Sequence, residues 1–167
     1  MTPREGDGVT RWGCAVVDFG GLTRPQQLID GMDLHEVYTR GERIRSGAGR
    51  GLRHWAGRLA AKRAVLDVLG VTAGAAHLGQ AEVLPRPTAL CDRSARCQHG
   101  HPPAVRLHGM LADRARRRGI EQIRLSITHT ADTALAVALV GPRLSDDDPP
   151  EAAVTTMTDA SMPPEAR

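Results

Sequence analysis

The segment from His54 to Gly70 constrains the fold more than any other part of the chain. It is rich in alanine and leucine, contains no proline and closes on a glycine, which predicts one helix. Its large apolar residues recur at helical spacing: Trp55, Leu59, Leu66 and Leu69. Charged residues recur on the other side, which we expect to be polar: Arg58, Lys62, Arg63 and Asp67. The pattern predicts an amphipathic helix that lays one face on a core.

Lys62 is the only lysine among the 22 lysine and arginine residues of the chain. An ammonium group is compact and its pKa can be tuned by its surroundings, whereas a guanidinium stays charged. Two interpretations remain open from the residues alone. Lys62 has a specific chemical role, or it is an incidental side chain on a solvated helix face.

The composition describes one domain with an aliphatic core. At 167 residues the chain can bury a sizeable core, and aromatic residues make up only 2% of it, so Leu, Val, Ile and Ala must fill that core. The net charge of +3 permits an acidic partner. Because so few aromatic side chains are present to stack on bases, we expect no nucleic-acid partner.

The sequence predicts a cytoplasmic protein without a membrane segment. No apolar run approaches the roughly 20 residues of a membrane span, and residues 1–10 lack the apolar core of a signal peptide. The three cysteines are odd in number, which favours reduced thiols.

Three parts of the chain are expected outside the regular core. Residues 1–10 are polar and predict a disordered leader, and residues 144–167 are acidic and Pro-rich, which predicts a disordered tail. The folded domain then covers residues 11–143, interrupted by an irregular insert at residues 87–101. The insert carries four residues that can ligate zinc: Cys91, Cys97, His99 and His101. Zinc binding and an extended hairpin loop both remain open.

The remaining pattern is that of an α+β domain. Strands are predicted at Arg11–Phe19, at residues 80–85, around Val105 and Leu107, and at 123–130 followed by 133–140 with a turn at Ala131-Asp132. A basic helix is predicted from Met110 to Arg118, with four arginines facing solvent: Arg114, Arg116, Arg117 and Arg118. Thr39 is placed to cap a helix that starts at Arg40, and residues 46–51 form a Gly-rich loop.

Three motifs give the chain a resemblance to a known family. They are Arg58-Leu59-Ala60-Ala61-Lys62 with the closing Leu69-Gly70, the strand Ser126-Ile127-Thr128-His129-Thr130, and the element Tyr38-Thr39-Arg40-Gly41-Glu42. Together they resemble the holo-acyl-carrier-protein synthases, a branch of the 4′-phosphopantetheinyl transferases. The resemblance covers residues 11–140.

The resemblance implies a fold, an activity and an assembly. The implied fold is a small antiparallel sheet packed with the long signature helix. The implied reaction transfers 4′-phosphopantetheine from coenzyme A to a serine of an acyl carrier protein and releases 3′,5′-ADP. The implied assembly is a homotrimer with sites between subunits.

The resemblance also implies site residues. Those implied to contact coenzyme A are Arg58, Lys62, Ser126, His129 and Thr130. Arg24 lies where the family keeps basic residues that dock the acidic carrier protein. Asp18 and Asp33 compete for the position of the family's magnesium-binding aspartate. Asp18 is preferred because its separation from Arg63 is close to that of the family, whereas Asp33 is too near.

Two departures from the family bear on the chemistry. Arg63 stands where the family has its second magnesium-binding residue, a glutamate, and Asp67 stands where it has a lysine. One carboxylate beside a guanidinium is a poor magnesium site. Because the two signs are exchanged together, we expect Arg63 and Asp67 to pair across one turn of the helix.

Three hypotheses follow. The first is a working transferase with Asp18, Lys62 and Arg63 as catalytic residues, in which Arg63 neutralises the pyrophosphate in place of magnesium. The second is a non-catalytic module that binds a carrier protein or coenzyme A. The third is an enzyme of fatty-acid or polyketide metabolism that acts on carrier-bound acyl groups, with Asp18, Lys62 or His129 as acid or base.

Overall fold

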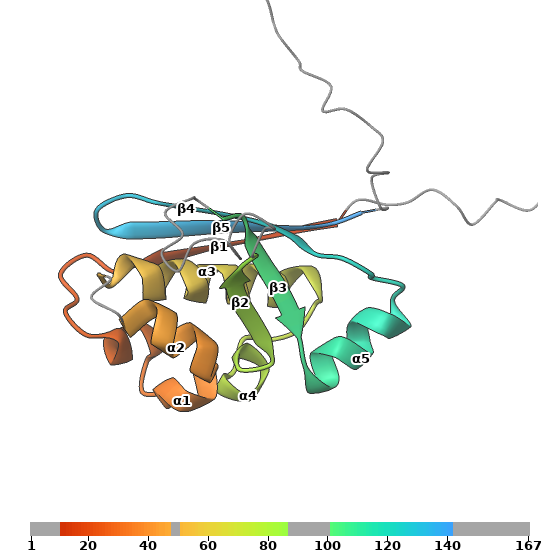
Figure 1. Cartoon of the computed structure of the whole chain (residues 1–167), viewed down its shortest axis with the longest axis horizontal. Coiled ribbons are helices and arrows are strands. Elements are labelled where there is room, and N and C mark those ends of the chain that lie inside the picture. Colours follow the sequence, from red (N-terminus) through yellow and green to blue (C-terminus); the bar gives the residue numbers. More distant parts are fainter. Residues whose placement is uncertain (1–10, 48–50, 87–100, 142–167) are drawn as a thin grey trace, which may run out of the picture.

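The computed structural model describes residues 11–47, 51–86 and 101–141. The predicted leader, the tail and most of the insert, including Cys91, Cys97 and His99, lie outside these ranges. The mixed helix and strand content confirms the predicted α+β class (Figure 1).

Helices and strands follow one another along the chain in a mixed order. They are β1 (Arg11–Asp18), the 3-10 helix η1 (Pro25–Ile29), α1 (Leu34–Val37), α2 (Arg40–Gly47), α3 (Arg53–Val68), α4 (Ala75–Leu78), β2 (Ala81–Pro85), β3 (Pro103–Leu107), α5 (Gly109–Arg117), β4 (Arg124–His129) and β5 (Thr133–Val140). Every predicted strand is present, and the turn at Ala131-Asp132 joins β4 to β5 as expected.

The strands form two antiparallel sheets. One has three strands in the order β1-β5-β4, and the other pairs β2 with β3. The first and last strands of the domain therefore lie side by side, with Arg11 opposite Val140 and Asp18 opposite Thr133. In Figure 1 the three-stranded sheet forms the upper layer and the helices lie below it.

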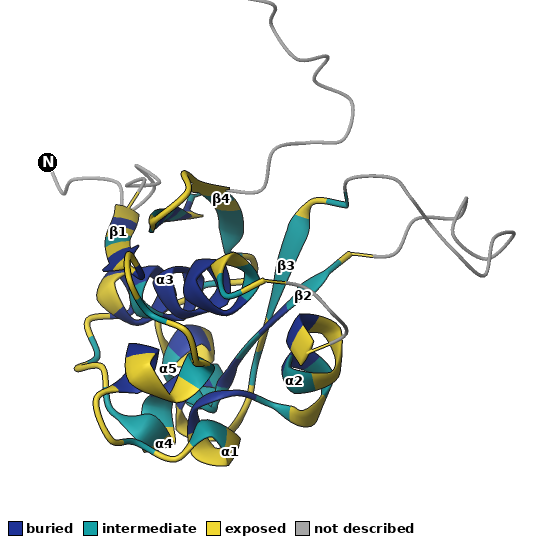
Figure 2. Ribbon diagram, turned by 90° about the vertical axis from the view of Figure 1, so that its left-hand side faces the viewer, coloured by how far each residue is buried: buried dark blue, intermediate teal, exposed yellow. Residues whose placement is uncertain are grey.

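Helix α3 runs through the middle of the molecule and is buried on nearly all sides (Figure 2). The expected apolar residues are buried, but the expected polar side is not solvated, because Arg58 and Lys62 are buried as well. The prediction of a half-exposed amphipathic helix was therefore wrong. The helix touches the sheet above and β2, α4 and η1 below, and its side chains bond to α2, so no side is left for a broad solvated face.

The end of α3 follows from Gly70, which has a left-handed φ of 60°. The Gly70 N–H donates to the Asp67 carbonyl and the Val71 N–H donates to the Leu66 carbonyl, at 2.9 Å each. This is the Schellman arrangement, which a glycine enters without strain. Arg114 of α5 and Arg118, the residue after that helix, donate to the Leu69 carbonyl at 2.7 and 2.8 Å. These two arginines are thus not simply solvated, as the sequence had predicted, but satisfy the end of α3.

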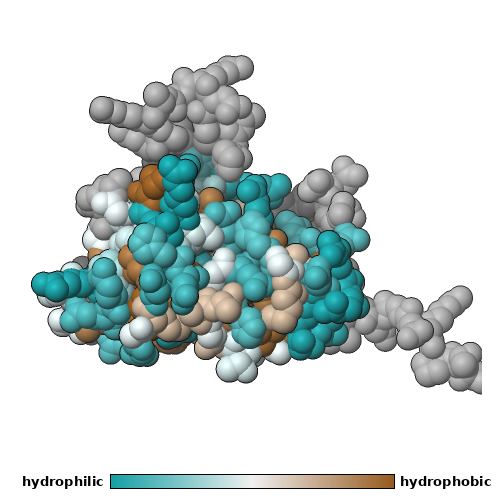
Figure 3. Space-filling view, turned by 90° about the horizontal axis from the view of Figure 1, so that it is seen from below, coloured by the Kyte–Doolittle hydropathy of each residue, from teal (hydrophilic) through white to brown (hydrophobic). Residues whose placement is uncertain are grey.

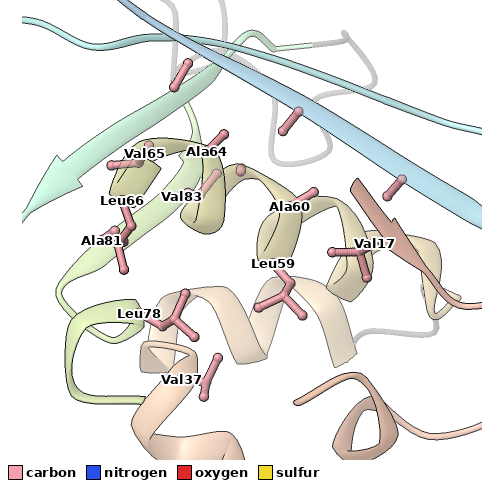
Figure 4. Close-up of a cluster of buried hydrophobic side chains, with 14 of the residues drawn as sticks. Val17, Val37, Leu59, Ala60, Ala64, Val65, Leu66, Leu78, Ala81 and Val83 are labelled. Atoms are coloured by element: carbon pink, nitrogen blue, oxygen red, sulfur yellow. The ribbon is translucent and has the colours of Figure 1, made fainter. Parts of the chain in front are cut away.

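Strand β1 approaches α3 very closely at Gly13. A Cβ atom at this position would lie 2.3 Å from the Ala64 carbonyl oxygen and 2.7 Å from the Val68 nitrogen. On β5, the residues that face α3 are small: Ala134, Ala136 and Ala138. Small residues on the sheet allow the helix to lie close to it, and the larger side chains of α3 fill the space on its other sides (Figure 4).

The two outer surfaces of the domain differ. The face of the three-stranded sheet turned away from α3 exposes Trp12, Val16 and Leu139, which are 68%, 54% and 40% exposed. The side formed by the helices is largely hydrophilic (Figure 3). No helix of the described residues is long and apolar enough to cross a membrane.

Candidate functional site

Lys62 forms a buried ion pair with Glu42. The Lys62 Nζ lies 2.8 Å from Glu42 Oε2, and both side chains are completely buried. The same ammonium donates to the Leu78 carbonyl at 2.9 Å and to the Ala81 carbonyl at 2.7 Å. Its three protons therefore all have acceptors, and they connect α3 to α2, to α4 and to the start of β2.

Glu42 is satisfied equally fully. Its Oε2 accepts from the Thr39 N–H at 2.8 Å, while the Thr39 hydroxyl accepts from the Glu42 N–H at 3.3 Å. This reciprocal pair is a capping box, and it confirms the predicted helix start after Thr39. The Glu42 Oε1 accepts from the Val83 N–H at 2.8 Å. Glu42 thus joins the start of α2, the centre of α3 and strand β2.

Burial dominates the ionisation behaviour of this region. Desolvation lowers the pKa of Lys62, and the neighbouring Glu42 carboxylate opposes that shift. Burial likewise raises the pKa of the Tyr38 hydroxyl, with a further contribution from Glu42, while Arg63 and Arg58 act in the opposite direction. The Tyr38 hydroxyl donates to the Trp55 carbonyl at 3.1 Å and stays protonated.

This geometry does not support the prediction that Lys62 is a catalytic or coenzyme-binding residue. A proton-transfer group or a phosphate ligand must reach the substrate, and the ammonium has no exposed surface. The structure gives the only lysine a structural role, with an acidic partner that spacing along the helix could not identify.

A small cavity lies where the beginning of α3 meets the second sheet and strand β4. Its volume is about 120 Å³. It is lined by several basic side chains, which are Arg53, His54, Arg58, His101 and His129, and by apolar groups that include Ile127 and Pro103. The rings of His54 and His129 are 6.4 Å apart and nearly edge to face. Of the residues predicted to bind coenzyme A, Arg58 and His129 meet here.

Hydrogen bonds to three groups help to fix Arg58 at this cavity. Its Nε donates to the Val83 carbonyl at 3.2 Å, and its Nη1 donates to the Ser46 hydroxyl at 2.6 Å and to the His54 carbonyl at 3.3 Å. Ser46 is buried in the last turn of α2, so it does not belong to the flexible loop predicted from residue 46. The guanidinium therefore presents a positive charge of fixed orientation to the cavity.

Asp18 and Thr130 lie at a different place, one end of the three-stranded sheet. The Asp18 carboxylate accepts from the Gly20 N–H at 2.9 Å. A Cβ atom on Gly20 would lie 3.3 Å from both Asp18 Oδ1 and Asp132 Cβ, so two carboxylates flank this glycine. The Thr130 hydroxyl donates to Asp132 at 2.7 Å, which lowers the pKa of Asp132.

The other predicted site residues are not brought to the cavity. Ser126 alternates with Ile127 along β4 and lies opposite Val137 on the outer face of the sheet. Arg24 is exposed at the start of η1. Asp33 caps α1 by accepting from the His35 N–H at 2.6 Å, which gives the rejected rival of Asp18 a structural role.

Arg63 and Asp67 do not form the expected ion pair. The Asp67 carboxylate instead accepts from the Cys14 N–H of β1 at 3.2 Å. Arg63 is half-buried on α3, near enough to Tyr38 to affect its ionisation. The exchange of signs at these two positions is therefore not explained by a bond between them.

The position that the resemblance assigns to a second magnesium ligand does not suit a cation. Nowhere in the described ranges do three or more His, Cys, Asp or Glu residues gather as metal ligands. The position at which the resemblance implies a second carboxylate carries the guanidinium of Arg63, which would repel a cation.

Sequence reasoning missed part of the basic cavity. Arg53 and His54 begin α3 and were not singled out, and His101 was considered only as a zinc ligand. The cluster could not be found from spacing, because its members come from elements far apart in the chain. A resemblance that named His129 and Arg58 was the only signal toward it.

Comparisons with known proteins identify the fold. No protein-family model and no curated protein matches the chain. Solved structures do match. A holo-acyl-carrier-protein synthase from Neisseria meningitidis is 21% identical, with a TM-score of 0.58, and the match covers 78% of this chain and 96% of that one. A synthase complex with coenzyme A from Chronobacterium ammoniagenes is 23% identical, with a TM-score of 0.59 and coverage of 80% and 97%.

A third match is the Helicobacter pylori synthase in complex with coenzyme A. It is 20% identical, with a TM-score of 0.56, and the match covers 77% of this chain and 98% of that one. The chain therefore has the fold of the holo-acyl-carrier-protein synthases. The resemblance seen in the sequence is confirmed at the level of the fold.

The first prediction concerns the buried ion pair. We expect Lys62→Met to lower the free energy of unfolding by about 3–5 kcal/mol, because it leaves the Glu42 carboxylate buried without its counter-charge. Urea denaturation at a fixed protein concentration measures the change. Adding Glu42→Gln to this variant should recover part of the loss.

The matched control is Arg106→Met. Arg106 pairs with Glu82 at 3.8 Å, but its side chain is 76% exposed, so its removal should cost less than about 1 kcal/mol. Equal losses for the buried and the exposed pair would show that Lys62 is not the structural centre of the domain.

Proposed function

We propose that this protein is a holo-acyl-carrier-protein synthase-like transferase that moves 4′-phosphopantetheine from coenzyme A to a serine of an acyl carrier protein. The observation that carries the proposal is the basic cavity of Arg53, His54, Arg58, His101 and His129 on a domain with the synthase fold. Two solved structures of that fold are described as coenzyme A complexes.

The chemistry of the cavity suits a phosphate group. Guanidinium and imidazole groups donate hydrogen bonds to phosphate oxygens, and Arg58 is held in one orientation before any ligand arrives. The volume of about 120 Å³ suits one phosphate group and not a whole nucleotide. We therefore place one end of coenzyme A here and the remainder across surface outside this cavity.

The reaction needs positive charge where the pyrophosphate breaks. The serine oxygen of the carrier attacks phosphorus, the bond to 3′,5′-ADP breaks, and the serine proton is lost to a base. We propose that Arg63 supplies the neutralising charge that magnesium supplies in the family, and that Asp18 accepts the proton. Lys62 acts only by holding α3 in place.

The partner in this proposal is an acidic carrier protein. Arg24 is exposed and follows Asp18 by six residues, and the net charge of +3 favours an acidic partner. The identity of the carrier protein decides whether the pathway is fatty-acid or polyketide biosynthesis.

A second candidate function is binding without transfer. It is favoured by the absence of a magnesium cluster among residues 11–47, 51–86 and 101–141 and by the burial of Lys62. The scaffold would then hold a carrier protein or coenzyme A, or would act on acyl groups that the carrier delivers. Turnover separates these candidates.

We further propose that the protein assembles as a homotrimer. The outer face of the three-stranded sheet exposes Trp12, Val16 and Leu139, and in the described part of the chain no helix covers it. An apolar sheet face of this kind is typical of an interface between copies. The proposal of three copies in the assembly rests on the family resemblance.

Coenzyme A binding tests the cavity. We expect His129→Ala to weaken binding about tenfold, because it removes a hydrogen bond to a charged group. Isothermal titration calorimetry measures the affinity, in magnesium and in chelator. Because Arg63 replaces the ion, the affinity should be the same in both.

The control for this variant is Thr128→Ala, which changes the preceding residue on the opposite face of β4. It should leave the affinity unchanged. An unchanged affinity in His129→Ala would remove the cavity from the site, and a loss of binding on chelation would contradict the role of Arg63.

Turnover tests the transferase itself. The protein is incubated with coenzyme A and an apo carrier protein, and the carrier is followed by intact mass. We expect slow transfer, because the loss of preorganised electrostatic support typically lowers the rate about 10²–10³-fold. The double variant Arg63→Glu with Asp67→Lys should gain magnesium-dependent transfer. No gain, with carrier binding intact, would favour the second candidate function.

Assembly is tested by light scattering at micromolar concentration. We expect a trimer for the natural chain and a monomer for Val16→Arg, which places a charge on the exposed sheet face. Ile44→Arg is the matched control, because Ile44 is 61% exposed on α2, away from the sheet. A monomeric natural chain would end the shared-site proposal.

A further inference from the structure

A second, larger cavity adjoins the basic cavity, with which it shares Pro103. Its volume is about 670 Å³, and it opens between strand β3, helix α5 and the segment that leads into β4. This volume is within the range of about 300–1,000 Å³ that small-molecule sites occupy. Neither the fold nor the proposed transfer reaction assigns a role to it.

Apolar side chains form part of the walls of this cavity. They include Val105 and Leu107 of β3, Ala112 and Ala115 of α5, and two isoleucines, Ile120 and Ile123. Several of these side chains pack against the core yet remain partly exposed. Apolar surface of this kind gains free energy when a hydrocarbon chain covers it.

The rim of the cavity is mainly positive. Three arginines line it, Arg86, Arg116 and Arg124, against one carboxylate, Glu121. Arg116 also contacts Asp113 one turn earlier on α5, in an exposed pair that a competing anion can replace at little cost. Guanidinium groups beside an apolar wall suit a carboxylate at the end of a hydrocarbon chain.

We infer that this cavity binds a medium-chain fatty carboxylate, with the chain against α5 and β3 and the carboxylate at the arginine rim. The inference does not depend on the proposed transferase activity. A cationic amphiphile is disfavoured by the three guanidinium groups, and an uncharged alcohol lacks the contact with the rim.

Decanoate is the probe, titrated into the full chain by calorimetry below its micellar concentration. We expect saturable binding that weakens about fourfold for each methylene removed, as in octanoate and hexanoate. Decanol should bind more weakly, and decyltrimethylammonium should not bind. Absence of saturable decanoate binding overturns the inference.

Two variants test whether decanoate binds in this cavity. Ala112→Phe fills the cavity from α5 and should abolish decanoate binding. Arg116→Gln removes one rim charge at the surface and should weaken decanoate about fivefold without changing decanol. Arg117→Gln is the matched control, because Arg117 is exposed on the same helix but does not line the cavity.

Each result bears on the inference even if one variant misfolds. Far-ultraviolet circular dichroism checks the fold, and Arg116→Gln remains informative if Ala112→Phe is unfolded. Equal effects of Arg116→Gln and Arg117→Gln overturn the inference. Loss of decanoate binding in Val16→Arg, with the cavity untouched, would place the ligand on the outer sheet face and would also overturn it.

Discussion

The buried ion pair of Lys62 and Glu42 is the interaction on which the rest of the structure depends. Two charges without solvent are costly, and they are tolerated here because every proton and every carboxylate oxygen has a partner. Those partners belong to α2, α3, α4 and β2, so the pair fixes four elements at once. An apolar pair of the same volume would fill the space but would not specify this arrangement through directed bonds.

A second buried cation of α3 positions the candidate site in the same way. Arg58 lies one helical turn before Lys62, and it too is buried and donates to a carbonyl of β2, that of Val83. Two cations of α3 therefore hold the second sheet against the helix. One of them, Arg58, also lines the basic cavity, so the contact that aligns the sheet orients the charge that would meet a phosphate. The same hydrogen bonds of α3 therefore hold both the candidate site and the buried core.

The sequence predicted the positions of helices and strands better than it predicted which of their faces are buried. Local signals placed the strands, the cap at Thr39 and the end of α3 at Gly70, because these depend on neighbouring residues. The environment of α3 was predicted wrongly, since spacing shows which residues share a face but not whether another layer covers that face. The basic cavity could not be predicted from the sequence for the same reason. His54, His101 and His129 come together only when β4 and the second sheet pack around α3.

The separation of fold and chemistry explains how Arg63 and Asp67 can differ from the family without a change of fold. The residues that hold the layers together are Lys62, Glu42 and Arg58, and their partners are mostly backbone groups that any sequence supplies. Arg63 is adjacent in sequence but lies outside this hydrogen-bonded network, and Asp67 contacts only the edge of β1. Substitution of Arg63 would leave the bonds between layers intact, whereas substitution of Asp67 would remove its bond to the Cys14 N–H of β1. In the proposed transferase, a change at Arg63 would therefore alter the charge of the site while the bonds that join α3 to α2, α4 and β2 stay in place.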